Sequence, residues 1–115
     1  MRRAVVIDDD EPVADLVASI LQAHGFDCQV AHSGNTGIRL VLDTLPHLVV
    51  CDMRMPGIGG EEVMLSLKAQ PATSHIPVVL ITGFCEDEYV GMGDAFMTKP
   101  FTSDALMATV RELAA

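Results

Sequence analysis

Polar residues that could take part in catalysis or ligand binding follow apolar runs at four places in this sequence. Asp8 and Asp9 come after the first run, Asp52 after a later one, Thr82 after a third and Lys99 after the last. Crowded carboxylates repel one another unless a cation is present, and Mg²⁺ prefers one or two carboxylates together with carbonyl and water oxygens. Mg²⁺ bound in this way leaves positions for phosphate oxygens, which a hydroxyl and an ammonium can also bind. These residue types predict a phosphate site in which an aspartate can be the nucleophile and form an aspartyl-phosphate.

Each of these residues has a plainer interpretation when it is taken alone. An aspartate after a strand is often the N-cap of the next helix, and we expect Asp10 and Glu11 to be helix-start residues only. A single threonine or lysine such as Thr82 or Lys99 is often an ordinary surface residue. The coincidence of all these groups at the ends of successive strands favours a shared site.

The elements that position these residues are predicted from the apolar pattern. Apolar runs alternate with helix-length segments along the whole chain, which is typical of an α/β fold with a parallel sheet and helices on both faces. In such sheets the functional crevice lies outside the carboxyl ends of the strands. Strands are predicted at 4–7, 26–31, 47–51, 76–81 and 95–98, and helices at 10–24, 33–44, 61–68 and 102–113.

Length and composition exclude several classes of function. The chain has 115 residues, half of them apolar, so we expect one domain spanning 1–115. A net charge of −9 argues against direct binding of nucleic acid, which requires clustered Lys and Arg. The apolar runs are too short to cross a bilayer, so we expect no membrane association and a cytoplasmic location. Cys28, Cys51 and Cys85 lack the spacing of a zinc site or a disulfide framework.

Four segments together resemble the receiver domain of two-component response regulators. In chain order they are VVIDDDEP, LVVCDMRMPG, VVLITG and FMTKPF, and the resemblance runs from about residue 3 to residue 113. Each segment alone is a weak signal, whereas the four in this order are a strong one. The resemblance implies a flavodoxin-like sheet with strand order 2-1-3-4-5, an order that the apolar pattern does not supply.

The resemblance also implies which residues bind the metal and the phosphoryl group. Asp52 is expected to accept a phosphoryl group from a phosphohistidine and to share a Mg²⁺ ion, or Mn²⁺ in its place, with other oxygen ligands. Asp9 is expected to be a direct ligand and Asp8 to act largely through water. The backbone carbonyl of Arg54 is the remaining protein ligand that the resemblance implies.

Further roles implied by the resemblance concern the phosphoryl group and the response to it. Thr82 is expected to hydrogen-bond the phosphoryl group, and Lys99 to pair with it. Phe96 stands where receivers often carry an aromatic side chain whose rotamer follows the movement of Thr82. Arg54 and Phe84 are expected to flank the path of attacking water and so to tune the rate of hydrolysis.

Two departures from the family pattern affect the expected output. Fewer residues than usual, 83–98, separate Thr82 from Lys99, so the fourth helix of the family should be shortened or irregular and the usual output surface altered. The loop 57–60 is rich in glycine and is expected to be unusually mobile. Switching would then either be weak or work by ordering disordered backbone on phosphorylation.

The expected function is phosphorelay signalling, with a sensor histidine kinase or a histidine phosphotransfer protein as donor and an output domain or protein as target. Such a domain is not a conventional enzyme, although it catalyses its own aspartyl phosphorylation and dephosphorylation. One alternative is a receiver-like docking module that works without phosphorylation. Another is a phosphatase of the haloacid-dehalogenase type that would use Asp8 and Asp10, but that family has Thr or Val where this chain has Pro12.

Overall fold

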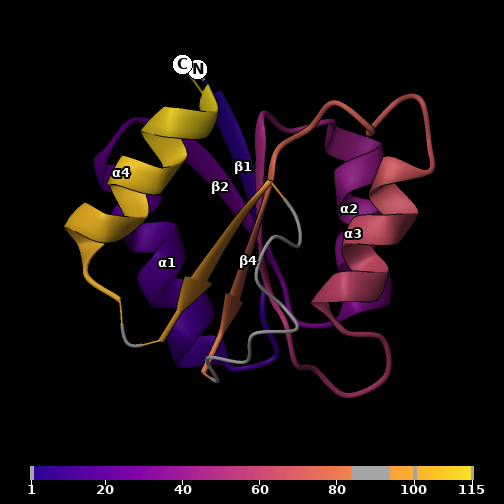
Figure 1. The fold of residues 1–115 in the computed structure, drawn as a ribbon, viewed down its shortest axis with the longest axis horizontal. Coiled ribbons are helices and arrows are strands. Elements are labelled where there is room, and N and C mark those ends of the chain that lie inside the picture. Colours follow the sequence, from indigo (N-terminus) through magenta and orange to yellow (C-terminus); the bar gives the residue numbers. More distant parts are fainter. Residues whose placement is uncertain (1, 84–93, 100, 115) are drawn as a thin grey trace.

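The computed structural model describes residues 2–83, 94–99 and 101–114. Helices and strands alternate through most of this part of the chain (Figure 1). In order, the elements are β1 (Arg2–Ile7), α1 (Glu11–Ala23), β2 (Phe26–Ala31), α2 (Gly34–Thr44), β3 (Leu48–Asp52), α3 (Gly60–Lys68), β4 (Val78–Thr82), β5 (Ala95–Thr98) and α4 (Ser103–Ala114).

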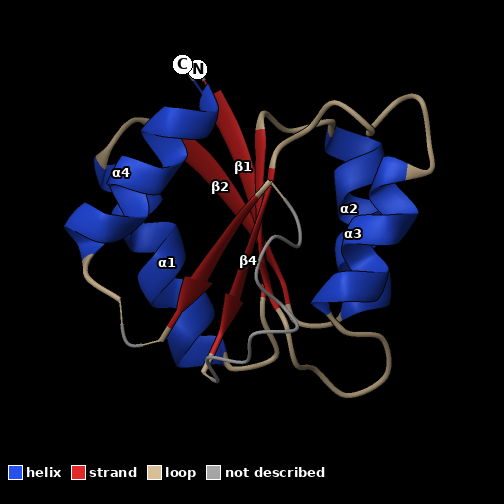
Figure 2. Cartoon of the chain, in the orientation of Figure 1, coloured by secondary structure: helices blue, strands red, loops and turns tan. Residues whose placement is uncertain are grey.

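The strands form one parallel sheet in the order β2-β1-β3-β4-β5. The sheet is the middle of three layers, with α1 and α4 on one face and α2 and α3 on the other (Figure 2). This arrangement confirms the α/β prediction, including the strand order that the resemblance implied. None of the described helices is long and apolar enough to span a membrane.

Two hydrophobic cores fill the spaces between the sheet and its two helix layers. Successive side chains of a strand point to opposite faces, so a strand in a sheet covered on both sides must be apolar throughout. The α1/α4 side receives Ala4, Val6, Leu48, Val50, Val79 and Ile81. The α2/α3 side receives Val5, Ile7, Val49, Cys51, Val78 and Leu80.

Local signals explain where α1 and α2 begin. The side chain of Asp10 caps α1 by accepting a hydrogen bond from the Val13 N–H at 3.3 Å, which confirms its helix-start role. Ser33 caps α2 in the same way. A glycine inside α2 has a packing reason, because a Cβ on Gly37 would lie 2.5 Å from Cδ1 of Ile7. The missing side chain therefore lets α2 approach β1 closely.

Element boundaries differ from the prediction by one or two residues. β4 begins at Val78 rather than at residue 76, because Pro77 has no N–H to donate to the sheet. α4 begins at Ser103, and the Thr102 hydroxyl accepts a hydrogen bond from the Ala105 N–H at 3.0 Å. The shortened or irregular fourth helix expected between β4 and β5 falls on residues 84–93, which lie outside the described part of the chain.

Asp94, the residue directly before β5, is held in place by contacts with β4 and α3. Asp94 exchanges two hydrogen bonds with Val78, its N–H donating to the Val78 carbonyl at 3.0 Å and its carboxylate accepting from the Val78 N–H at 2.7 Å. Lys68, at the end of α3, lies 2.8 Å from the same carboxylate and donates to the carbonyl of Ile76 at 2.9 Å. The start of β5 is thus attached to both β4 and α3.

Candidate functional site

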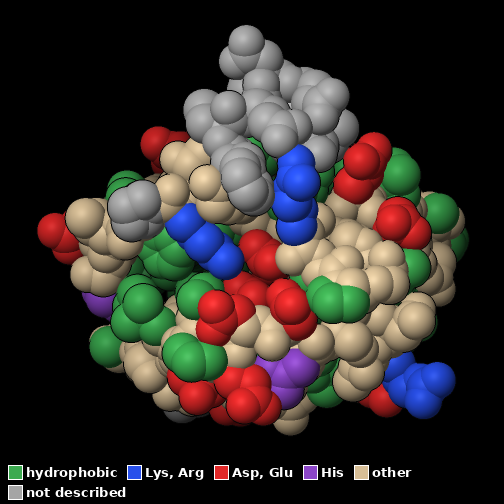
Figure 3. Space-filling view, turned by 90° about the horizontal axis from the view of Figure 1, so that it is seen from below, with side chains coloured by type: hydrophobic (Ala, Val, Ile, Leu, Met, Phe, Trp, Pro, Cys, Tyr) green, Lys and Arg blue, Asp and Glu red, His purple; other side chains and the backbone are tan. Residues whose placement is uncertain are grey.

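Three carboxylates meet at the carboxyl ends of β1 and β3. The side-chain oxygens of Asp8, Asp9 and Asp52 can all lie within 4.8 Å of one another. Asp8 is 4% exposed and Asp52 is 8% exposed, whereas Asp9 is open to solvent. Figure 3 looks onto this end of the sheet and shows acidic side chains around a central hollow, with basic side chains beside them. The sheet therefore brings together the three aspartates that the sequence singled out.

Backbone hydrogen bonds fix the two buried aspartates in place. The Asp8 N–H donates to the Ala31 carbonyl at 3.0 Å, which extends the pairing of β1 with β2 by one residue. The Asp8 carboxylate accepts from the Asp10 N–H at 3.0 Å. Asp52 is the last residue of β3, and the Met53 N–H directly after it donates to the β4 carbonyl of Ile81 at 2.7 Å. The backbone at both aspartates is therefore held by the sheet itself.

Lys99 brings a positive charge to the same cluster. Its Nζ lies 3.2 Å from Oδ1 of Asp52 and 3.5 Å from Oδ2 of Asp8. The Lys99 N–H donates to the carbonyl of Thr82 at 2.7 Å, so the lysine is placed by the end of β4. Thr82 is 1% exposed and is the last residue of β4. The neighbouring ends of β4 and β5 thus complete the group of residues predicted from the sequence.

The charges of this cluster are only partly balanced. Burial raises the pKa of Asp8, although the Asp10 N–H and the charge of Lys99 act against the rise. Burial also raises the pKa of Asp52, with a further contribution from Asp8, while Lys99 again opposes it. For Lys99, burial lowers the pKa, but Asp52 and Asp8 together outweigh it and the net shift is upward. Burial and mutual repulsion therefore act against the charged forms of Asp8 and Asp52, and a bound cation would relieve both effects.

The other predicted site residues occupy different surroundings. Arg54 is exposed, two residues past the end of β3. Phe96 is half-buried in β5, where it pairs in register with Leu80 and packs against the α2/α3 core. Phe84 lies outside the described residues. The roles expected of these three residues stay predictions.

His32, for which the sequence indicated no functional role, also lies against the site. Its Nδ1 is 3.1 Å from the backbone carbonyl of Asp8 and, since that carbonyl can only accept, the ring nitrogen donates. Its Nε2 is 3.9 Å from a carboxylate oxygen of Glu11. His32 directly follows β2, and the strand order that places β2 beside β1 is the signal that could have identified it.

The loop between β3 and α3 packs closely on the end of β3. A Cβ on Gly60 would lie 2.5 Å from the carbonyl oxygen of Asp52, and one on Gly59 would lie 2.7 Å from that of Met53. The side chain of Ile58 lies so close to Gly34, at the start of α2, that a Cβ there would be 2.4 Å from it. These glycines therefore allow close approach of the backbone. The mobility expected of the loop 57–60 is a separate matter and stays a prediction.

A doubly wound parallel sheet with this polar cluster at its carboxyl edge defines the receiver class of signalling domains. The chain belongs to the response regulator receiver domain family, whose model matches residues 4–111. Membership places it in two-component phosphorelay signalling.

Among curated proteins the chain is similar to the DNA-binding dual master transcriptional regulator RpaA of Synechocystis sp. The two are 35% identical over 118 residues, which cover 98% of this chain and 49% of RpaA. The chain thus spans about half the length of this curated relative.

Solved structures show the same fold. Response regulator protein TrrA from Thermotoga maritima, in complex with Mg(2+)-BeF, is 26% identical with a TM-score of 0.88, covering 98% of this chain and 99% of TrrA. The signal receiver domain of a signal transduction histidine kinase from Syntrophus aciditrophicus is 27% identical with a TM-score of 0.90, covering 99% of this chain and 90% of that one. Vibrio cholerae chemotaxis protein CheY4, at 19% identity and a TM-score of 0.92 over 98% of both chains, supports the fold alone.

Proposed function

We propose that Asp52 accepts a phosphoryl group from the phosphohistidine of a sensor histidine kinase or a histidine phosphotransfer protein. The resulting aspartyl-phosphate changes how this receiver domain, residues 1–115, binds an output domain or protein. The observation that carries the proposal is the buried Asp52 at the end of β3, with Lys99 at 3.2 Å and two further aspartates beside it. Membership of the receiver family supports it as well.

The carboxylates of Asp8, Asp9 and Asp52 would hold Mg²⁺, or Mn²⁺ in its place, with the backbone carbonyl of Arg54 as a further ligand. An all-oxygen donor set is the one that Mg²⁺ prefers, and Asp8 and Asp52, buried beside one another, present carboxylate charge that a divalent ion would offset. When bound, the ion supplies positive charge against the carboxylates and the incoming phosphate oxygens. The structure of TrrA with Mg(2+)-BeF supports the same choice of metal.

In the transfer, a carboxylate oxygen of Asp52 attacks phosphorus while the bond from phosphorus to the donor imidazole nitrogen breaks. The electron pair of that bond leaves with the imidazole. The ammonium of Lys99 is close enough to Asp52 to bind one phosphoryl oxygen, and the hydroxyl of Thr82 would bind another. Attack of water on phosphorus later frees the Asp52 carboxylate, at a rate that Arg54 and Phe84 would tune. The chain therefore contributes position and charge balance.

The response to phosphorylation would begin at Thr82. A movement of the Thr82 hydroxyl toward the phosphoryl group shifts the end of β4. This shift reaches Phe96 of β5, because Phe96 is paired in register with Leu80 of β4. Because Phe96 is half-buried against the α2/α3 core, a change of its rotamer alters the surface beside β5. We propose this surface as the one that differs between the two states.

The test is the intact mass of the chain after incubation with acetyl phosphate. We expect a gain of one phosphoryl group that requires Mg²⁺ and is absent from Asp52→Asn. Asp43→Asn, which removes an exposed carboxylate of α2 away from the site, is the matched control and should be phosphorylated like the parent. If no donor phosphorylates the parent chain, the docking module that works without phosphorylation becomes the better explanation.

Metal binding has its own readout in thermal unfolding. Excess Mg²⁺ should raise the melting temperature, since a ligand at about 100 times its Kd stabilises the folded state by about 2.7 kcal/mol. Asp9→Asn should reduce this rise because it removes a metal ligand that is exposed and so contributes little to folding. An equal rise in parent and variant would refute the assignment of Asp9.

A further inference from the structure

A cavity of about 420 Å³ opens at the end of the sheet opposite Asp52. It lies between the starting ends of β1, β2, β3 and β4 and the last turn of α4, at the upper end of the sheet in Figure 1. Its volume falls within the range of roughly 300–1,000 Å³ that small-molecule sites occupy. The proposed phosphoryl transfer makes no use of this cavity.

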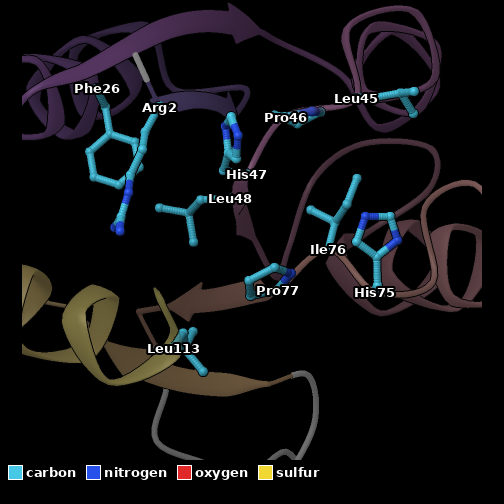
Figure 4. A pocket seen from close by; sticks show the side chains of 10 residues that line it. All are labelled: Arg2, Phe26, Leu45, Pro46, His47, Leu48, His75, Ile76, Pro77 and Leu113. Carbon is cyan, nitrogen blue, oxygen red and sulfur yellow. The ribbon is translucent and has the colours of Figure 1, made fainter. Parts of the chain in front are cut away.

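The titratable side chains that line the cavity are all basic or neutral. They are Arg2, His47 and His75, and none of the lining residues that the structure describes is an aspartate or glutamate. This is unexpected on a chain with a net charge of −9. In Figure 4 the side chain of Arg2 runs past the ring of Phe26, and His47 lies between Arg2 and Pro46. The rim is therefore suited to a ligand with negative charge.

Arg3 holds one wall of the cavity in a fixed shape. Its N–H donates to Nδ1 of His47 at 3.0 Å, so the hydrogen of a neutral His47 ring is on Nε2, which becomes a donor. The Arg3 guanidinium donates to the carbonyl of Leu45 at 3.1 Å, and its carbonyl accepts from the His47 N–H at 2.8 Å. Three bonds thus keep the segment from Leu45 to His47 in place, which lowers the ordering cost of binding.

The rest of the lining is apolar. Leu45 is 46% exposed and has a φ of 47°, in the left-handed region. Phe26 and Leu113 form walls on either side. An apolar body would cover these side chains while its charged end meets the basic rim.

We propose that this cavity binds a small organic anion with an apolar body, of the size and chemistry of an aromatic carboxylic acid. Binding here is independent of phosphorylation at Asp52. The carboxylate would pair with the guanidinium of Arg2 and accept from Nε2 of His47, and the ring would pack between Phe26, Leu45 and Leu113.

The probes are 2-naphthoate and its uncharged analogue 2-naphthamide, titrated separately into the isotopically labelled full chain and followed by amide chemical shifts. We expect saturable shifts at Arg2, His47, Leu48, Ile76 and Leu113, with naphthoate bound more tightly than the amide. Arg2→Glu should weaken naphthoate about tenfold, the usual scale for loss of one charged hydrogen bond, and leave the amide nearly unchanged. Arg39→Glu, the same change at an exposed position of α2, should bind both like the parent.

The inference fails if naphthoate causes no saturable shifts, or if it binds no more tightly than the amide. It also fails if the shifts cluster at the Asp52 end of the sheet, or if Arg39→Glu weakens binding as much as Arg2→Glu. Arg2→Gln, which removes the same charge without adding a carboxylate, should also weaken naphthoate and spare the amide, so a loss of folding in Arg2→Glu would still leave the test decisive. The inference is also overturned if the cavity residues shift only when a peptide or a second copy of the chain binds, and not with naphthoate.

Discussion

Replacing Gly60 by alanine provides a test in which two physical effects predict opposite changes in the stability of the folded chain. Gly60 is the first residue of α3, and helix propensity alone predicts that alanine stabilises by up to about 1 kcal/mol. The added Cβ, however, would lie 2.5 Å from the Asp52 carbonyl oxygen and 3.0 Å from Cα of Met53. Since ordinary contacts begin near 3.4 Å, backbone must move by about 1 Å, and neither neighbour is a flexible side chain.

We therefore expect Gly60→Ala to lower the free energy of unfolding. Overpacking of this kind costs about 1–3 kcal/mol, and the rigid backbone neighbours favour the upper part of that range. After the helix gain is subtracted, the net loss should be about 2 kcal/mol, measured by urea unfolding. Because the displaced carbonyl belongs to Asp52, phosphorylation by acetyl phosphate should also slow.

Gly83→Ala is the matched control. Gly83 directly follows Thr82, but none of the residues that the structure describes lies within 4 Å of where its Cβ would be, and its backbone is outside the left-handed region. Its replacement should change stability by less than about 0.5 kcal/mol and leave phosphorylation unchanged. The reasoning is refuted if Gly60→Ala is as stable as Gly83→Ala, or if it is more stable than the parent.

Two further predictions concern charged groups. Burial raises the pKa of Asp8 in the folded chain, so its contribution to stability is full below the ordinary aspartate pKa of about 3.9 and is lost as pH rises through the folded value. Without Mg²⁺, Asp8→Asn should therefore be more stable than the parent at neutral pH and not at acidic pH; a less stable variant at neutral pH contradicts this. Lys68→Met should lose about 1–2 kcal/mol, because it removes an ion pair to Asp94 and hydrogen bonds to two carbonyls. A double-mutant cycle with Asp94→Asn measures the coupling, and additive losses would show that the pair does not interact.

The sequence predicted those parts of the fold and the site that depend on a single local rule. The apolar runs had to be strands covered on both faces, and the polar residues that follow them had to meet because parallel strands end at one edge. Asp8, Asp52, Thr82 and Lys99 were therefore brought together as expected. Their chemical roles were implied by the family resemblance and await the mass measurement.

Features that depend on which strands are neighbours could not be predicted from local rules. His32 reaches the Asp8 carbonyl only because β2 lies beside β1, and the apolar pattern did not supply that order. The pair of Lys68 and Asp94 joins positions far apart in the chain. The basic rim around Arg2 and His47 arises at the other end of the sheet, where sequence reasoning placed no site.

The fixing of Asp94 also has a use in protein engineering. Both ends of the connection from β4 to β5 are held by described residues: Thr82 through its carbonyl, which accepts from the Lys99 N–H, and Asp94 through Val78 and Lys68. Lengthening a loop whose ends are already anchored is inexpensive, since each doubling of its length adds only about 0.6 kcal/mol of closure entropy. The connection between Gly83 and Asp94 is therefore the place to graft a recognition peptide or a fluorescent reporter, since it begins directly after Thr82 at the phosphoacceptor edge.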